Sequence, residues 1–228
     1  MLKEYRKTAR TAGVWWLLFI IIGPISYLFV DEKLLVPGDA AATVNNINSA
    51  LALFWFGAAA FLAGYACFIM LGKSLCKLFK TVDPRLTKWM IGLVIVGTAV
   101  VLIGKAAEIA AANADNMDDA AGLLDLRLNM EMAGELFWGL WLVPLVMLIF
   151  KSVFIHRAIG GLLLLAAGYH LAVFSMFFIR GADVSTHPAL AAAGLIGEIA
   201  MVLWLLVKGV KTQAHRFPSN SLSSDESF

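Results

Sequence analysis

The feature that most constrains this chain is a series of apolar stretches, each about 20 residues long. A helix of that length, rising ~1.5 Å per residue, crosses the ~30 Å hydrocarbon core of a bilayer. Only 15% of the 228 residues are charged, whereas a soluble domain carries about 25%. The pattern excludes a soluble two-domain protein and predicts an all-α membrane protein, a bundle of six transmembrane helices. The predicted spans are Ala12–Val30, Leu51–Gly72, Trp89–Ala110, Met130–Phe150, Ala158–Ile179 and Ala189–Lys208.

Lysine and arginine are distributed unequally between the two sides of this predicted bundle. They are concentrated before the first span, after the second, after the fourth and after the sixth. Cytoplasmic segments carry an excess of these residues, so both termini are predicted to be cytoplasmic. The residues on that side are Lys3, Arg6, Lys7, Arg10, Lys73, Lys77, Lys80, Arg85, Lys88, Lys151, Arg157, Lys208, Lys211 and Arg216.

The segments outside the spans suggest three regions. We expect a basic cytoplasmic N-terminus over 1–11, a transmembrane domain over 12–210 and a disordered cytoplasmic tail over 211–228. The connector Lys73–Lys88 interleaves lysines with apolar residues, so it is predicted to rest on anionic lipids. The predicted partner is thus the lipid bilayer, with no nucleic acid, and the oligomeric state is left open.

A turn signal follows the first span. Pro37 and Gly38 are typical turn residues, and Asp39 is placed to cap a short helix at the outer surface. The sequence therefore predicts a short surface helix before the second span.

Three stretches occur in a characteristic order: VPGDAAAT after the first span, GLWLVPL in the fourth and GEIAMVLWLLVKGV at the end of the last. Over roughly residues 9 to 210 the chain resembles the DUF4386 family of bacterial membrane proteins, a domain of unknown function. Where that family has Leu-Pro-Arg, this chain has Ile155-His156-Arg157. The resemblance implies a multi-pass protein of the bacterial cytoplasmic (inner) membrane. It supplies no catalytic residue, and the cofactor question stays open.

Six ionisable side chains lie within or at the ends of the predicted spans. Such groups are costly in a bilayer and usually face the bundle interior or a water-filled cavity. They therefore mark the candidate ligand- or ion-binding positions. The first candidates are Lys105, Glu135, His170 and Glu198, and the secondary ones are Glu108 and Glu131.

The depths of these side chains predict two pairs. Lys105 and Glu135 each lie about 24 Å from the cytoplasmic end of their helix, so we expect an ion pair between them. His170 and Glu198 lie at about 18 and 15 Å, which predicts a second pair near the midplane. Glu108 and Glu131 fall near 28 to 30 Å, at the outer boundary. Together these side chains predict a polar cavity open to the outside.

Three classes of function fit this pattern. The first is binding or transport of a small solute or proton, in which Glu198 and His170 exchange the proton. The second is a non-catalytic membrane sensor or accessory subunit. The third is a metal-dependent membrane enzyme, which the sequence favours least because the Glu-x-x-His pairs of diiron bundles are absent. No catalytic residue and no metal ligand is assigned.

Overall fold

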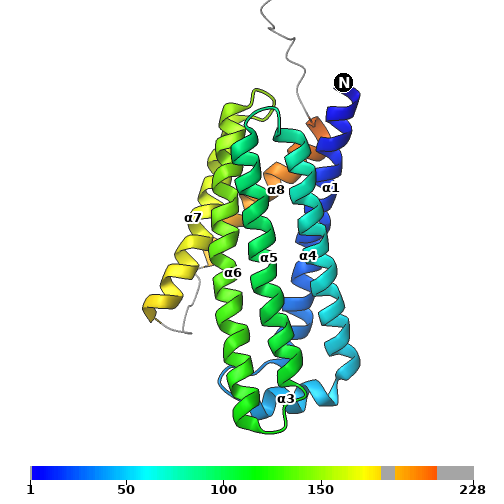
Figure 1. Ribbon diagram of the computed structural model, residues 1–228, viewed down its shortest axis with the longest axis vertical. Coiled ribbons are helices and arrows are strands. Elements are labelled where there is room, and N and C mark those ends of the chain that lie inside the picture. The colour runs from blue at the N-terminus through cyan, green and yellow to red at the C-terminus, as the bar shows by residue number, and fades with distance from the viewer. Residues whose placement is uncertain (1, 181–187, 210–228) are drawn as a thin grey trace, which may run out of the picture.

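The computed structural model describes residues 2–180 and 188–209, and within these ranges the chain forms helices and loops without strands (Figure 1). Six long or medium helices are joined by shorter pieces, two of which are π-helical turns named η1 and η2. The elements are α1 (Leu2–Ser26), η1 (Tyr27–Asp31), α2 (Glu32–Leu34), α3 (Ala40–Ser49), α4 (Leu51–Phe79), α5 (Pro84–Ala111), α6 (Met117–Lys151), α7 (Arg157–Arg180), α8 (Pro188–Leu203) and η2 (Trp204–Lys208).

The helices form a closed ring in chain order. α1 packs on α4, and each later helix packs on its neighbour through α5, α6 and α7 to α8. The ring closes because α8 and η2 return to α1. Figure 1 shows α7 diverging from α6 towards its C-terminal end, while α8 crosses behind the bundle at a slant. The side chains that face the centre of this ring therefore come from helices far apart in the sequence.

Five helical segments in the described ranges are long and apolar enough to cross a membrane. They are Glu4–Leu34, Leu51–Phe79, Pro84–Ala111, Met117–Lys151 and Arg157–Ile179. Each contains one predicted span and extends beyond it, because hydropathy marks the part in hydrocarbon whereas backbone hydrogen bonding continues into the headgroups and water. The predicted span Ala189–Lys208 coincides with α8, which has 16 residues, and the five residues of η2.

The end opposite the N-terminus is covered by the segment between η1 and α4. Here α3 lies across the bundle end (Figure 1), and Asp39 caps it by accepting a 2.8 Å hydrogen bond from the Ala42 N–H. Gly38 forms the preceding turn with a φ of 75°, a conformation that costs glycine little. The predicted turn and cap are confirmed. The predicted tail 211–228 lies outside the described residues.

The N-caps of α5 and α6 define two further helix connections. Asp83 caps α5 by accepting hydrogen bonds from the Arg85 and Leu86 N–H groups at 3.0 and 3.1 Å, and proline occupies the first turn. Asn116 caps α6 by accepting a 2.8 Å hydrogen bond from the Asp119 N–H. These caps satisfy N–H groups that have no partner within the helix. They fix where two adjacent and antiparallel helices begin.

The interior is apolar and rich in aromatic side chains. Trp16 and Phe68 are almost completely buried, and each packs against Trp141, with ring centroids 5.5 and 5.3 Å apart. Because lipid tails are as apolar as this core, close packing and polar contacts must distinguish the folded arrangement from separated helices. The positions of the buried polar groups are therefore informative.

Candidate functional site

The buried ionisable side chains form two clusters. The outer charge network consists of five residues near the end covered by α3. The acid–histidine site consists of three residues nearer the centre. The members of the network are Asp31, Lys105, Glu108, Arg127 and Glu131, and those of the site are Glu135, His170 and Glu198.

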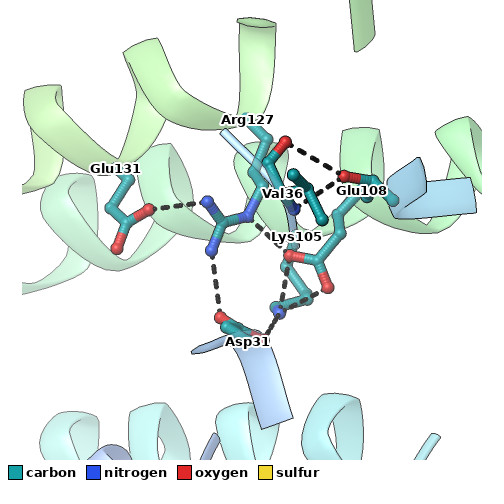
Figure 2. Close-up of polar contacts among 7 residues, drawn as sticks. Asp31, Val36, Lys105, Glu108, Arg127 and Glu131 are labelled. Carbon is teal, nitrogen blue, oxygen red and sulfur yellow. Dashed lines mark hydrogen bonds and ion pairs between the residues drawn. The ribbon is translucent and has the colours of Figure 1, made fainter. Parts of the chain in front are cut away.

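Arg127 is the centre of the outer charge network (Figure 2). Its guanidinium donates to Glu108 at 2.7 Å and to Asp31 at 3.0 Å, and it lies 3.0 Å from Glu131. A planar guanidinium with five N–H donors can serve three carboxylates at once, which a lysine ammonium does less well. Arg127 thereby joins η1, α5 and α6.

Lys105 is the second cation of the network. Its ammonium lies 2.8 Å from both oxygens of Glu108 and 3.5 Å from Asp31, and it sits 4.9 Å from the centroid of the Phe61 ring. The Lys105 and Glu108 side chains are 5% and 2% exposed, so water solvates neither charge. Burial of this kind is tolerated only when each charge has close partners.

The predicted ion pair between Lys105 and Glu135 is wrong. Lys105 reaches Glu108, three residues further along its own helix, and Asp31 from η1 completes its surroundings. The pairing depends on the direction of each side chain around the helix axis, which depth along the axis does not determine. The rotation of α6 directs Glu135 towards α7 instead, where it contacts His170.

Two members of the network, Asp31 and Arg127, were not among the predicted candidates because both lie just outside the predicted spans. Arg127 stands four residues before Glu131, a spacing that places the two side chains on one helical face. That spacing was the available signal. No comparable signal marks Asp31, because its contact depends on the π-helical turn η1, which changes which side chains face the bundle.

The acid–histidine site places one imidazole between two carboxylates. A 2.7 Å hydrogen bond joins Nδ1 of His170 to Oε2 of Glu135 on α6. Nε2 of His170 lies 3.7 Å from Oε1 of Glu198 on α8, a distance typical of an ion pair rather than of a hydrogen bond. The pairing of His170 with Glu198 therefore agrees with the sequence prediction, and Glu135 joins it as a third member.

Trp16 of α1 also contacts this site, a residue that the sequence did not identify. Its indole N–H donates a 3.3 Å hydrogen bond to Oε2 of Glu198. The Trp138 ring meets the His170 ring edge to face, with centroids 5.7 Å apart. The three acid–histidine side chains are 14 to 17% exposed, so the site is mostly enclosed by helices and aromatic rings.

Two glycines allow the helices to approach closely enough for these contacts. A Cβ at Gly139 on α6 would lie 2.6 Å from Leu171 Cγ on α7. A Cβ at Gly197 on α8 would lie 2.6 Å from the Leu162 carbonyl oxygen. Since the second obstacle is backbone, only glycine fits there without moving a helix. Glu198 follows Gly197 directly, so this close approach brings α8 and its carboxylate to His170.

Two surface hollows in the described part of the chain lie away from both clusters. One is lined by residues 6–15 of α1 and the other by residues 113–123 around the start of α6. Neither contains a residue of the network or of the acid–histidine site. The predicted cavity open to the outside therefore stays a prediction. Of the network residues, Glu131 is the most accessible, with 34% of its side chain exposed.

The comparison with protein families connects this geometry to the sequence motifs. The family model for a domain of unknown function, DUF4386, matches residues 11–209. The chain belongs to the DUF4386 family. The predicted resemblance is thus confirmed over nearly the same range, and the long apolar helices support an integral membrane protein. No curated protein and no solved structure matches the chain.

The chemistry available to this DUF4386 chain is set by the protons of the acid–histidine site. A neutral imidazole has one N–H donor and one acceptor nitrogen, whereas both ring nitrogens of His170 face carboxylate oxygens. The arrangement suits a protonated imidazole, in which both ring nitrogens carry N–H donors. Within the described ranges no group of three or more His, Cys, Asp or Glu residues is placed to hold a metal ion.

Proposed function

We propose that this DUF4386 chain is a six-span protein of the bacterial cytoplasmic membrane. In this proposal the acid–histidine site binds a proton within the bilayer and couples it to the movement of a small solute. The observation that carries the proposal is the position of His170, between Glu135 and Glu198 on two other helices. An intramembrane cluster of acids and histidine is the arrangement through which many pumps and transporters relay protons.

The coupling follows from electrostatics. With a proton on His170, the ring attracts both carboxylates and holds α6, α7 and α8 together. When the proton leaves, two acids face each other across a neutral ring, and in a poorly solvated interior this repulsion is strong. A change of one proton therefore changes the forces between three helices, which is the requirement for linking proton binding to a conformational change.

The topology in this proposal has six crossings with both termini in the cytoplasm. α8 and η2 together extend about 30 Å, enough to cross a bilayer. A Cβ built at Gly209 would lie within 4 Å of Arg6 and Ala9, so the two ends of the described chain meet at one end of the bundle. An even number of crossings gives that arrangement, and the basic residues at this end favour the cytoplasmic side. The connector Lys73–Lys88 at the same end would face anionic lipids.

The first experiment tests proton binding directly. Infrared difference spectra of the purified protein between about pH 5 and pH 8, the range in which histidine chemistry operates, report protonated carboxyl groups. We expect a carboxyl band in the wild type that Glu198→Gln and Glu135→Gln remove. The control Glu32→Gln changes an exposed acid outside the site and should retain it. A spectrum that none of the site variants alters would refute the proton-binding site.

The second experiment tests movement across the bilayer. Proteoliposomes with an internal pH-sensitive dye are exposed to an imposed pH gradient. With a pool of small solutes present on one side, wild-type protein should dissipate the gradient faster than protein-free vesicles, and His170→Gln should abolish the difference. If the infrared band depends on the site but no flux occurs, the transport part of the proposal fails, and a non-catalytic sensor becomes the better description.

A further inference from the structure

A second ligand site is indicated on the outward face of α1, at the membrane surface. We propose that the hollow lined by Lys7, Arg10 and Trp15 binds the headgroup of an anionic phospholipid, with an acyl chain lying along the same helix. This proposal does not depend on the acid–histidine site. It begins from the hollow itself, an open depression of about 530 Å³ on the surface of α1. Its lining residues are Arg6, Lys7, Arg10, Thr11, Val14 and Trp15.

The composition of the lining indicates the charge of the ligand. The Lys7 and Arg10 side chains are exposed, and they lie three residues apart on one face of the helix. Arginine and lysine bind phosphate through charge-assisted hydrogen bonds. No acidic side chain lines the hollow. The chemistry therefore fits a phosphate group.

The surface beyond the hollow distinguishes a lipid from a free phosphate. Val14, Leu17 and Ile21 continue the line of Lys7 and Arg10 at spacings of three and four residues, and they are 45, 38 and 53% exposed. The opposite face of α1 is buried in the bundle. A cationic hollow that leads directly into an exposed apolar stripe matches a molecule with an anionic head and an apolar tail.

The depth of these side chains agrees with that ligand. Arg10 precedes the apolar run that begins at Ala12, so its guanidinium lies where headgroup phosphates are found. Ile21 lies about 16 Å further along the helix, comparable with one leaflet of the ~30 Å hydrocarbon core. Trp15 stands at the junction, and amphipathic indole rings are enriched at this level of membranes.

The experiment uses quenching of Trp15 fluorescence by lipids that carry bromine on the acyl chain. Full-length protein is reconstituted in phosphatidylcholine vesicles with an equal small fraction of brominated phosphatidylglycerol or brominated phosphatidylcholine. The Trp15 signal is the difference between wild type and Trp15→Phe. We expect stronger quenching by phosphatidylglycerol, and the excess should vanish in the Trp15→Phe background.

Two matched double variants separate a defined site from general attraction to anionic lipid. K7Q/R10Q should weaken the preference for phosphatidylglycerol about fivefold for each cation removed, since a basic side chain at an anionic surface contributes ~1 kcal/mol. K33Q/R157Q removes the same charge from exposed positions outside both the hollow and the connector and should leave the preference unchanged. Equal losses in the two double variants would overturn the site in favour of diffuse attraction.

A third arm distinguishes lipid from free anion. Inorganic phosphate, added against chloride at equal ionic strength, should leave the phosphatidylglycerol quenching unchanged. Displacement by phosphate, or equal quenching by both lipids in the wild type, would also overturn the proposal. If K7Q/R10Q does not retain its helical circular dichroism spectrum, the single variants K7Q and R10Q replace it.

Discussion

At the scale of single residues, this protein solves the problem of buried charge by sharing cations among acids. Arg127 serves Glu108, Asp31 and Glu131, while Lys105 serves Glu108 and Asp31. A buried ion pair does not guarantee net stability, because removing charges from water costs several kcal/mol for each ion. Removal of one partner, however, leaves the others without neutralisation. The stability of the protein should therefore fall much more when one charged residue of the network is replaced than when a cation and an acid are replaced together.

The first prediction concerns Arg127. Arg127→Gln should lower the free energy of unfolding by about 3–5 kcal/mol, because the buried Glu108 and Asp31 carboxylates lose their main cation. Arg127→Gln combined with Glu108→Gln should recover part of this loss, since Lys105 still neutralises Asp31. Equilibrium unfolding in mixed detergent micelles measures both values. Arg157→Gln, at an exposed position, is the control, and an equal effect of Arg127→Gln and Arg157→Gln would contradict the prediction.

At the scale of elements, close helix contacts determine which side chains meet. Gly139 lets α6 approach α7, and Gly197 lets α8 approach α7. The turn η1 between α1 and α2 brings Asp31 to the helices that carry the other charges. The two clusters are therefore consequences of helix separation and helix rotation as much as of residue type.

The second prediction tests the contact between α7 and α8. Gly197→Ala should destabilise the protein by about 1–3 kcal/mol, a typical cost of overpacking, because the new Cβ would meet the Leu162 carbonyl group at 2.6 Å. Gly168→Ala is the matched control on α7, where a Cβ meets nothing within 4 Å. It should be neutral or stabilising by up to ~1 kcal/mol, because alanine is the better helix former. Detergent unfolding measures both, and equal stability of the two variants would show that α8 can shift freely.

The third prediction concerns the end of the bundle where α5 begins and α6 ends. A 2.6 Å hydrogen bond from Lys151 to Asp83 is the main cause that lowers the pKa of Asp83, and the Leu86 N–H lowers it further. A lowered pKa in the folded protein means that the stabilisation is present above the ordinary aspartate pKa and is lost as the pH falls through the folded value. The stability advantage of wild type over Asp83→Asn should therefore be constant near neutral pH and shrink in acid. Thermal unfolding at a series of pH values measures it, and an advantage that persists or grows in acid would contradict this assignment.

At the scale of the whole molecule, a ring of helices closes at α1. This closure brings the first and last described segments together, as Gly209 beside Arg6 and Ala9 shows. It also places Trp16 of α1 against Glu198 of α8, 182 positions apart in the sequence. A contact between residues so far apart in the sequence cannot be predicted from any local sequence pattern.

The fourth prediction tests the proposed topology. In a background with Cys67 and Cys76 replaced by serine, single cysteines are introduced at Asp39, Lys80 and Lys208. A membrane-impermeant thiol reagent applied to intact spheroplasts should label position 39 but not 80 or 208. After lysis all three should react. Labelling of position 208 in intact spheroplasts would imply an odd number of crossings and would reject the six-span arrangement.

The sequence by itself determined the class of the protein, its family, and the approximate position of each apolar helix. Hydropathy and the DUF4386 motifs are properties of short segments, so they are readable without knowledge of the fold. The sequence also indicated that His170 and Glu198 lie at similar depth, because depth follows from counting residues along a helix.

Only the tertiary structure decided which charged groups meet. Glu135 contacts His170 rather than Lys105, because contact depends on the rotation and separation of helices, which hydropathy does not encode. Asp31 joins the network through the π-helical turn, and Trp16 reaches Glu198 through closure of the ring. The position of a residue along its helix follows from counting residues, so the sequence supplies it. Which side chains meet depends on how every helix is rotated and placed, so only the complete fold decides it.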